Sequence, residues 1–82
     1  MKRERLISER NKKRKTQLQV AQDLDISEVY VRKLESGSVN PGRDTMFKFE
    51  NYYKVDAKKL FPDIFLRFDD KKVIKDKPSA SA

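Results

Sequence analysis

The stretch that decides the fold is residues 16–37, TQLQVAQDLDISEVYVRKLESG. Its first four residues form a capping box, because the Thr16 hydroxyl can accept the amide of Gln19 while the Gln19 side chain reaches back to the amide of Thr16. Apolar residues then recur at helical spacing, at Val20, Ala21 and Leu24. The stretch therefore begins with a short helix that runs to about Asp23.

A turn and a second helix follow at once. Residues 25–27 interrupt the pattern, and Ser27 is a favourable N-cap for a helix over about residues 28–36. Gly37 can adopt the left-handed conformation that ends a helix. Two short helices joined by such a turn are a helix-turn-helix.

The flanking sequence is helical as well, since no alternating run rich in Val, Ile and Thr argues for a strand. Residues 3–13 predict a first helix, residues 38–43 a loop that contains Pro41 and Gly42, and residues 44–53 a fourth helix. Asp56 can cap a short fifth helix. The apolar side chains that mark these helices are Leu6, Ile7, Met46, Phe49, Tyr53, Leu60 and Phe61. The fold class is all-α with five helices and a short C-terminal extension.

The length of 82 residues leaves room for one domain. We expect it to span residues 1–68, because apolar side chains continue past Pro62 to Phe68. Residues 69–82 are charged and then small and polar, so we expect a flexible tail there. No run approaches the roughly 18 apolar residues of a transmembrane helix, and no apolar segment follows the basic start as in a signal peptide. A cytoplasmic protein is the expectation.

Composition excludes several classes of function. The chain has no Cys and no His, which excludes disulfides, zinc fingers and His-based catalysis. With two glycines and no phosphate-binding loop, no catalytic constellation is left, so we expect no enzyme, no metal and no cofactor. The net charge is +7, and residues 1–15 hold eight basic and two acidic side chains, a balance of +6. This local excess indicates a polyanionic partner, with a solvated basic helix face as the alternative.

The sequence resembles the phage Cro/repressor-type (XRE-like) helix-turn-helix family. The family's T-Q-x-E-[LV]-A is met by residues 16–21, and its L-G-[VI]-S-x-x-x-[VI]-x-x-[LI]-E-x-G by residues 24–37. Further matches, to P-x-x-x-T-[LM]-x-K-[LF] and to V-x-x-x-x-L-F, are Pro41, Thr45, Met46, Lys48, Phe49, Val55, Leu60 and Phe61. The resemblance covers about residues 5–62. It implies a compact lambda-repressor-like domain and a DNA-binding transcriptional regulator.

A few positions depart from the family pattern. Asp25 stands where the family usually has glycine, and Asp tolerates the left-handed conformation at modest cost. Arg14 and Lys15 replace a frequent Gly-Leu, which makes the loop before the second helix more basic. Glu50 and Tyr52 replace frequent alanines, which bears on the packing of the fourth helix and on a dimer face there.

The resemblance implies that the helix over residues 28–36 enters the major groove while the preceding helix crosses the DNA backbone. Helical geometry agrees, because Val31 and Leu34 facing a core leave the opposite side exposed. Arg and Lys can donate to guanine, Glu can accept from cytosine, and Val can contact a thymine methyl. The base-contacting residues expected on that side are Glu28, Val29, Arg32 and Lys33; without the family motif they would be ordinary solvated side chains.

Other residues are expected at the DNA backbone: Gln17, Ser27, Tyr30, Ser38, Asn40, Arg43, Lys13, Arg14 and Lys15. Gln17 lies beside the free amides of a helix start, where a phosphate oxygen binds well. For Ser27 a purely capping role, and for Tyr30 packing over the loop, are the alternatives. Arg10 and Glu35 match family positions that form a salt bridge, which is a structural role.

One helix reads only about four base pairs, so the resemblance implies a homodimer on an operator that is an inverted repeat. The apolar residues available for dimerisation are Leu60, Phe61, Ile64, Phe65 and Phe68, which could equally complete the monomer's core. The expected function is a sequence-specific repressor of phage or mobile-element type, acting by operator occupancy on the nucleoid of a prokaryotic or phage-infected cell. The alternative is an antitoxin or protein-interaction module on the same scaffold.

Overall fold

The computed structural model describes residues 2–65, and within them all regular secondary structure is helical. The five helices are α1 (Glu4–Lys12), α2 (Gln17–Leu24), α3 (Glu28–Ser36), α4 (Arg43–Tyr53) and α5 (Ala57–Leu60). Residues 62–65 add one more helical turn. The all-α prediction is confirmed, and the predicted helix bounds differ from the observed ones by about one residue.

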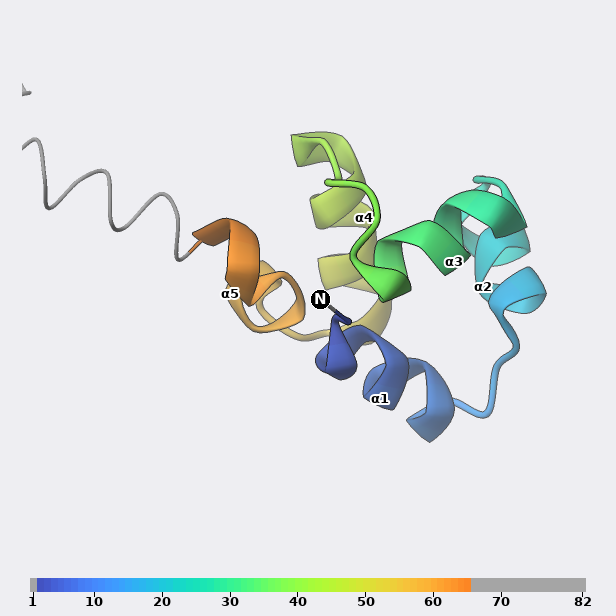
Figure 1. Ribbon diagram of the computed structural model, residues 1–82. Helices are drawn as coiled ribbons and strands as arrows, with labels where there is room; N and C mark the ends of the chain where they lie inside the picture. Colours follow the sequence, from blue (N-terminus) through green and yellow to red (C-terminus); the bar gives the residue numbers. More distant parts are fainter. Residues whose placement is uncertain (1, 66–82) are drawn as a thin grey trace, which may run out of the picture.

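The helix-turn-helix lies at one end of the domain (Figure 1). The figure shows α2 and α3 at one end of the domain and α5 at the other, with α1 and α4 between them. The start of the chain lies near the centre, where the backbone amide of Arg3 donates to the carbonyl of Glu35 at 2.8 Å. The helix-turn-helix is therefore held at one end of a scaffold made by the other helices.

One apolar core joins all five helices. Its buried members are Leu6 from α1, Val20 and Ala21 from α2, Val31 and Leu34 from α3, Phe49 and Tyr53 from α4, and Leu60 with Phe61 at α5. The rings of Phe49 and Phe61 meet edge to face with centroids 6.0 Å apart, a favourable aromatic geometry. Burial of these side chains is the main force that seats α3.

The turns around the helix-turn-helix follow from local side-chain chemistry. Thr16 and Gln19 form the reciprocal capping box, and the Ser27 hydroxyl accepts the amide of Tyr30. Asp25 ends α2 in the left-handed conformation (φ 59°), as the sequence predicts for the position where the family has glycine. Gly37 does the same for α3 at no steric cost.

The assignment of Leu60 and Phe61 to a dimer interface is wrong. Both side chains have no exposed surface in the single chain, so they complete its own core and offer nothing to a partner. Ile64 and Phe65 are half-buried. Phe68 and the predicted tail over residues 69–82, with the domain boundary at residue 68, lie outside the described residues.

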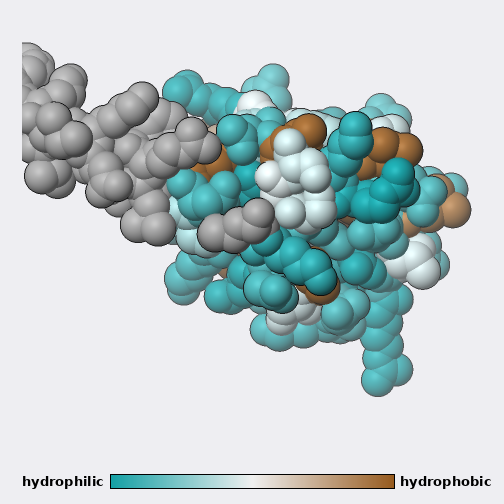
Figure 2. Space-filling view, viewed as in Figure 1, coloured by the Kyte–Doolittle hydropathy of each residue, from teal (hydrophilic) through white to brown (hydrophobic). Residues whose placement is uncertain are grey.

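The length of the helices and the polarity of the surface can be compared with what the sequence predicts. None of the helices within residues 2–65 is long and apolar enough to cross a membrane. Figure 2 shows that the visible side of the molecule is mostly hydrophilic, with apolar residues in small separate patches.

Candidate nucleic-acid interface

Helix α3 has two chemically different faces. Val31, Leu34 and Glu35 point into the domain and are buried. Successive helical residues turn by about 100°, which places Glu28, Val29, Arg32 and Lys33 together on the other side. All four are exposed, Val29 by 46%. The structure therefore brings the four predicted base-contacting residues to one exposed face.

These exposed side chains are also free of internal partners. Within residues 2–65, the side chains of Glu28, Arg32 and Lys33 make no hydrogen bond or ion pair. Ser36 lies on the same face and was missed by sequence reasoning, because serine at a helix end gives no distinctive signal. Its hydroxyl lies 2.7 Å from that of Ser38. The face thus offers a mixed set of donors, one carboxylate acceptor and one apolar contact.

A buried polar triad fixes α3 to the rest of the helix-turn-helix. Glu35 is only 3% exposed and accepts from Arg10 Nε at 2.7 Å, Arg10 Nη2 at 3.2 Å and Gln17 Nε2 at 3.0 Å. The hydrogen bond to Glu35 raises the pKa of the Arg10 guanidinium above its ordinary value. Gln17, expected at the DNA backbone, thus has its amide nitrogen turned to Glu35.

The other predicted backbone residues of the helix-turn-helix also have internal roles. Ser27 caps α3. Tyr30 is half-buried against the core, and its hydroxyl donates to Thr45 Oγ1 at the long distance of 3.5 Å. Both residues remain at the rim of the exposed face, because Ser27 is exposed and Tyr30 is only partly covered.

The loop after α3 is shorter than predicted. Arg43 is not in it, as the sequence suggested, but is the first residue of α4 and is exposed. Ser38 and Asn40 lie in the loop itself and are exposed. The side-chain oxygen of Asn40 already accepts a hydrogen bond from Arg3 Nη2 at 3.1 Å, which leaves its amide nitrogen for other contacts.

Two of the three lysine and arginine residues before α2 are engaged by α2 and α4. Lys13 Nζ lies 5.0 Å from the centroid of the Tyr52 ring, and Lys15 Nζ lies 3.3 Å from Asp23 Oδ2. The Tyr52 hydroxyl donates to the same carboxylate. Partial burial and this hydrogen bond raise the pKa of Tyr52 to about 12, while the bond keeps the pKa of Asp23 below its ordinary value. Arg14 is exposed and adopts φ 58°.

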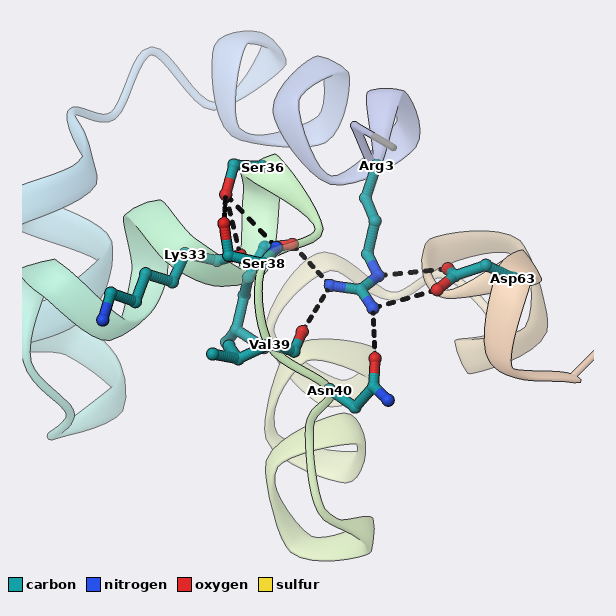
Figure 3. A network of polar contacts seen from close by, with 8 residues as sticks. Arg3, Lys33, Ser36, Ser38, Val39, Asn40 and Asp63 are labelled. Carbon is teal, nitrogen blue, oxygen red and sulfur yellow. Dashed lines mark hydrogen bonds and ion pairs between the residues drawn. The ribbon is translucent and has the colours of Figure 1, made fainter.

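Sequence reasoning missed Arg3 altogether. It belongs to the basic N-terminal tract, yet its side chain is 1% exposed and lies among groups from α3, the following loop and residues 61–63 (Figure 3). The side chain of a charged residue near the start of a chain is normally expected to be exposed to solvent. Only an acidic partner far along the chain could have signalled its burial, and such pairs have no fixed spacing.

An exposed polar face on the second of two capped helices, braced from behind by a buried ion pair, defines a helix-turn-helix protein. A sequence model of the helix-turn-helix family matches residues 6–60, more than half of the chain. The chain therefore belongs to the helix-turn-helix family of Cro/repressor (XRE-like) type, which is a family of DNA-binding transcription regulators and generally not of enzymes. Comparison with curated proteins and with solved structures gives no significant match.

Proposed function

We propose that the protein is a sequence-specific repressor of phage or mobile-element type, which occupies an operator with α3 in the major groove. The observation that carries the proposal is the exposed face of α3. Its four side chains have no partner within residues 2–65, while the opposite face is locked by apolar burial and by Glu35. A rigid helix with an unpaired polar face suits base recognition, since few internal bonds must break when DNA binds.

The side chains on that face supply complementary chemistry for base edges. Arg32 and Lys33 are donors suited to guanine O6 and N7, Glu28 is an acceptor for cytosine N4, and Val29 suits a thymine methyl. Each good pairing discriminates against a wrong base by about 1–3 kcal/mol. A few such contacts per subunit would give an operator preference.

A hollow beside the face supports backbone contacts. It measures about 350 Å³ and lies where α1, α2 and α3 meet, with Lys2, Gln17 and Arg32 among its lining residues. Its lining also includes Arg10 and the Glu35 carboxylate that Arg10 binds. With Arg32 assigned to a base edge, Lys2 and the amino-terminal end of α2 are the groups that favour a phosphate there. Phosphate contacts of this kind set the register of α3 in the groove without reading sequence.

A second copy of the chain completes the proposal, because one recognition helix reads too few base pairs. An apolar groove of about 520 Å³ lies between α4 and the helical turn over residues 62–65, lined in part by Met46, Phe47, Ile64 and Phe65. Phe47 is 52% exposed. With Leu60 and Phe61 in the core, this groove is the surface within residues 2–65 to which we assign dimerisation, and Phe47→Lys is expected to shift the protein to monomer in sedimentation analysis.

The deciding experiment is selection of binding sites from a random duplex pool, followed by comparison of two variants. We expect an inverted repeat, and we expect Arg32→Ala to relax the preference at one position of each half-site. The control is Lys58→Ala, which removes the same charge from α5, at the opposite end of the domain from α2 (Figure 1). It should leave the selected sequence unchanged.

Two results would refute the proposal. If no sequence is enriched over scrambled competitor, the scaffold serves protein binding, as in an antitoxin, and not operator recognition. If Arg32→Ala weakens binding to all duplexes equally, Arg32 contacts phosphate and the assignment of base readout to this face is wrong.

A further inference from the structure

The guanidinium of Arg3 is buried and has every N–H group paired. Nε and Nη2 donate to the two carboxylate oxygens of Asp63 at 3.1 and 3.0 Å. Nη1 donates to the carbonyls of Leu34 at 2.7 Å and Val39 at 2.9 Å, and Nη2 also donates to Asn40 Oδ1 at 3.1 Å. Figure 3 shows these contacts converging on one planar group. Five donors and five bonds are the full capacity of an arginine.

These contacts join the start of the chain to residues that lie 31 to 60 positions further along. Leu34 belongs to the last turn of α3, Val39 and Asn40 belong to the loop after it, and Asp63 belongs to the helical turn after α5. The aromatic ring of Phe61, next to that turn, lies 5.5 Å from the guanidinium carbon and adds a cation–π contact. Arg3 is thus a junction between the two ends of the domain.

The loop depends on this junction to an unusual degree. Ser38 is tied to α3 through Lys33 and Ser36. Beyond it, the hydrogen bonds that residues 39–41 make within the described part of the chain all go to Arg3. Val39 packs against the core and Pro41 is buried, but neither contact fixes the direction of the Asn40 side chain. The polar contacts of the loop beyond Ser38, and with them the direction of the Asn40 side chain, therefore depend on one guanidinium.

We propose that Arg3 and Asp63 are positioning residues for DNA binding, which couple the turn over residues 62–65 to the loop between α3 and α4. This inference rests on the proposed function, in which that loop lies along the DNA backbone. Asp63 holds the guanidinium, and the guanidinium in turn holds the Val39 carbonyl and the Asn40 side chain, so that the Asn40 amide group faces a phosphate. A change at residues 62–65 is accordingly transmitted through Arg3 to the DNA-facing loop, and also to the Leu34 carbonyl at the end of α3.

The Arg3–Asp63 pair is suited to this role because it depends on the shape of the guanidinium and on the charge of the carboxylate. A planar guanidinium binds a carboxylate with two parallel bonds and still directs donors to three other acceptors, which an ammonium cannot do. A buried arginine without its carboxylate is strongly unfavourable, so loss of Asp63 drives Arg3 away from the loop.

The first test uses the free protein and needs no DNA. Asp63→Asn keeps the shape of the side chain and removes its charge, and Arg3→Lys is the second variant. Native-state hydrogen exchange should show the hydrogen-bonded amides at the two ends of the loop, those of Ser38 and Met46, exchanging about tenfold faster relative to those of α2. The control is Arg5→Lys, whose residue pairs with Glu9 on the same helix and leaves the loop untouched. Equal acceleration of all amides, or none in the loop, would overturn the positioning role.

The second test measures DNA binding at a temperature where each variant is fully folded by circular dichroism. We expect Asp63→Asn to lower operator affinity about tenfold while the order of preference among operator variants stays the same. A loop that loosens without any change in affinity would overturn the link to DNA. If wild-type protein prefers no duplex, the proposed function fails, while the exchange experiment still decides whether Arg3 and Asp63 position the loop.

Discussion

Replacement of Glu35 is expected to remove a large part of the stability of the domain. The carboxylate is buried and accepts three hydrogen bonds, two of them from Arg10. In Glu35→Leu the Arg10 side chain, 16% exposed, keeps only its bond to the Lys15 carbonyl at 3.0 Å. Breaking a buried pair costs about 3–5 kcal/mol, and the partial exposure of Arg10 places this variant near ~3 kcal/mol.

That loss is large for a chain of this size. At about 0.05–0.15 kcal/mol per residue, 82 residues give a free energy of unfolding of roughly 4–12 kcal/mol. A loss of ~3 kcal/mol corresponds to a fall of about 12–24 °C in Tm. Arg10→Met is expected to cost a similar amount, because it leaves a buried carboxylate with Gln17 as its remaining partner.

The double variant Arg10→Met/Glu35→Leu distinguishes coupling from simple addition. Met and Leu at these positions form a hydrophobic pair of similar volume, with no charge left in the interior. The free energy of unfolding of the double variant should therefore return to within about 1 kcal/mol of wild type. Urea unfolding followed by circular dichroism measures all four proteins of the cycle. If the double variant loses as much as the two single variants together, about 6 kcal/mol, then Arg10 and Glu35 do not act as a pair and the reasoning is refuted.

Three further predictions concern backbone strain and the two adjacent tyrosines. Arg14→Gly should raise the free energy of unfolding by about 0.5–1 kcal/mol in urea melts, because φ 58° is costly for arginine and not for glycine. Tyr53→Phe should leave the free energy of unfolding unchanged or raise it, since the buried Tyr53 hydroxyl has no hydrogen-bond partner within the described residues. Tyr52→Phe should lower it by up to about 1 kcal/mol, because the bond to Asp23 is lost. Equal effects of the two substitutions would contradict both predictions. The pKa of Tyr52 rises on folding from 10.0 to about 12, so the stability it contributes is complete below pH 10 and declines as the pH rises towards 12. Melting curves across that window should therefore converge for wild type and Tyr52→Phe, and a constant difference would argue against the raised pKa.

The parts of the fold that sequence predicted are those with local causes. Thr16, Ser27 and Gly37 act on amides or dihedral angles within about three residues, so the helix ends they set could be read directly. The exposed face of α3 could be predicted for the same reason, because helical periodicity alone separates Arg32 and Lys33 from the buried residues.

The parts that sequence did not predict depend on distant partners. Arg3 meets Asp63 at a separation of 60 residues and Leu34 at 31, and no periodic pattern links such positions. Leu60 and Phe61 form an apolar helix end that suits a core or an interface equally well by composition. Their burial in three dimensions, where Phe61 meets the ring of Phe49, decides for the core.

The distribution of basic residues shows how charge must be read against its partners. Of the eight basic side chains in residues 1–15, five lie in ion pairs: Arg3, Arg5, Arg10, Lys12 and Lys15. A paired cation must give up or share its carboxylate before it binds phosphate, so it contributes less to counterion release on DNA binding. Arg32 and Lys33 have no such partner within residues 2–65 and lie on the exposed face of α3, and Arg43, also outside the ion pairs there, begins α4. In the tract, Lys2, Lys13 and Arg14 lie outside the ion pairs of the described residues, so we expect the tract to contribute less to DNA binding than its net charge suggests, because much of that charge serves the fold.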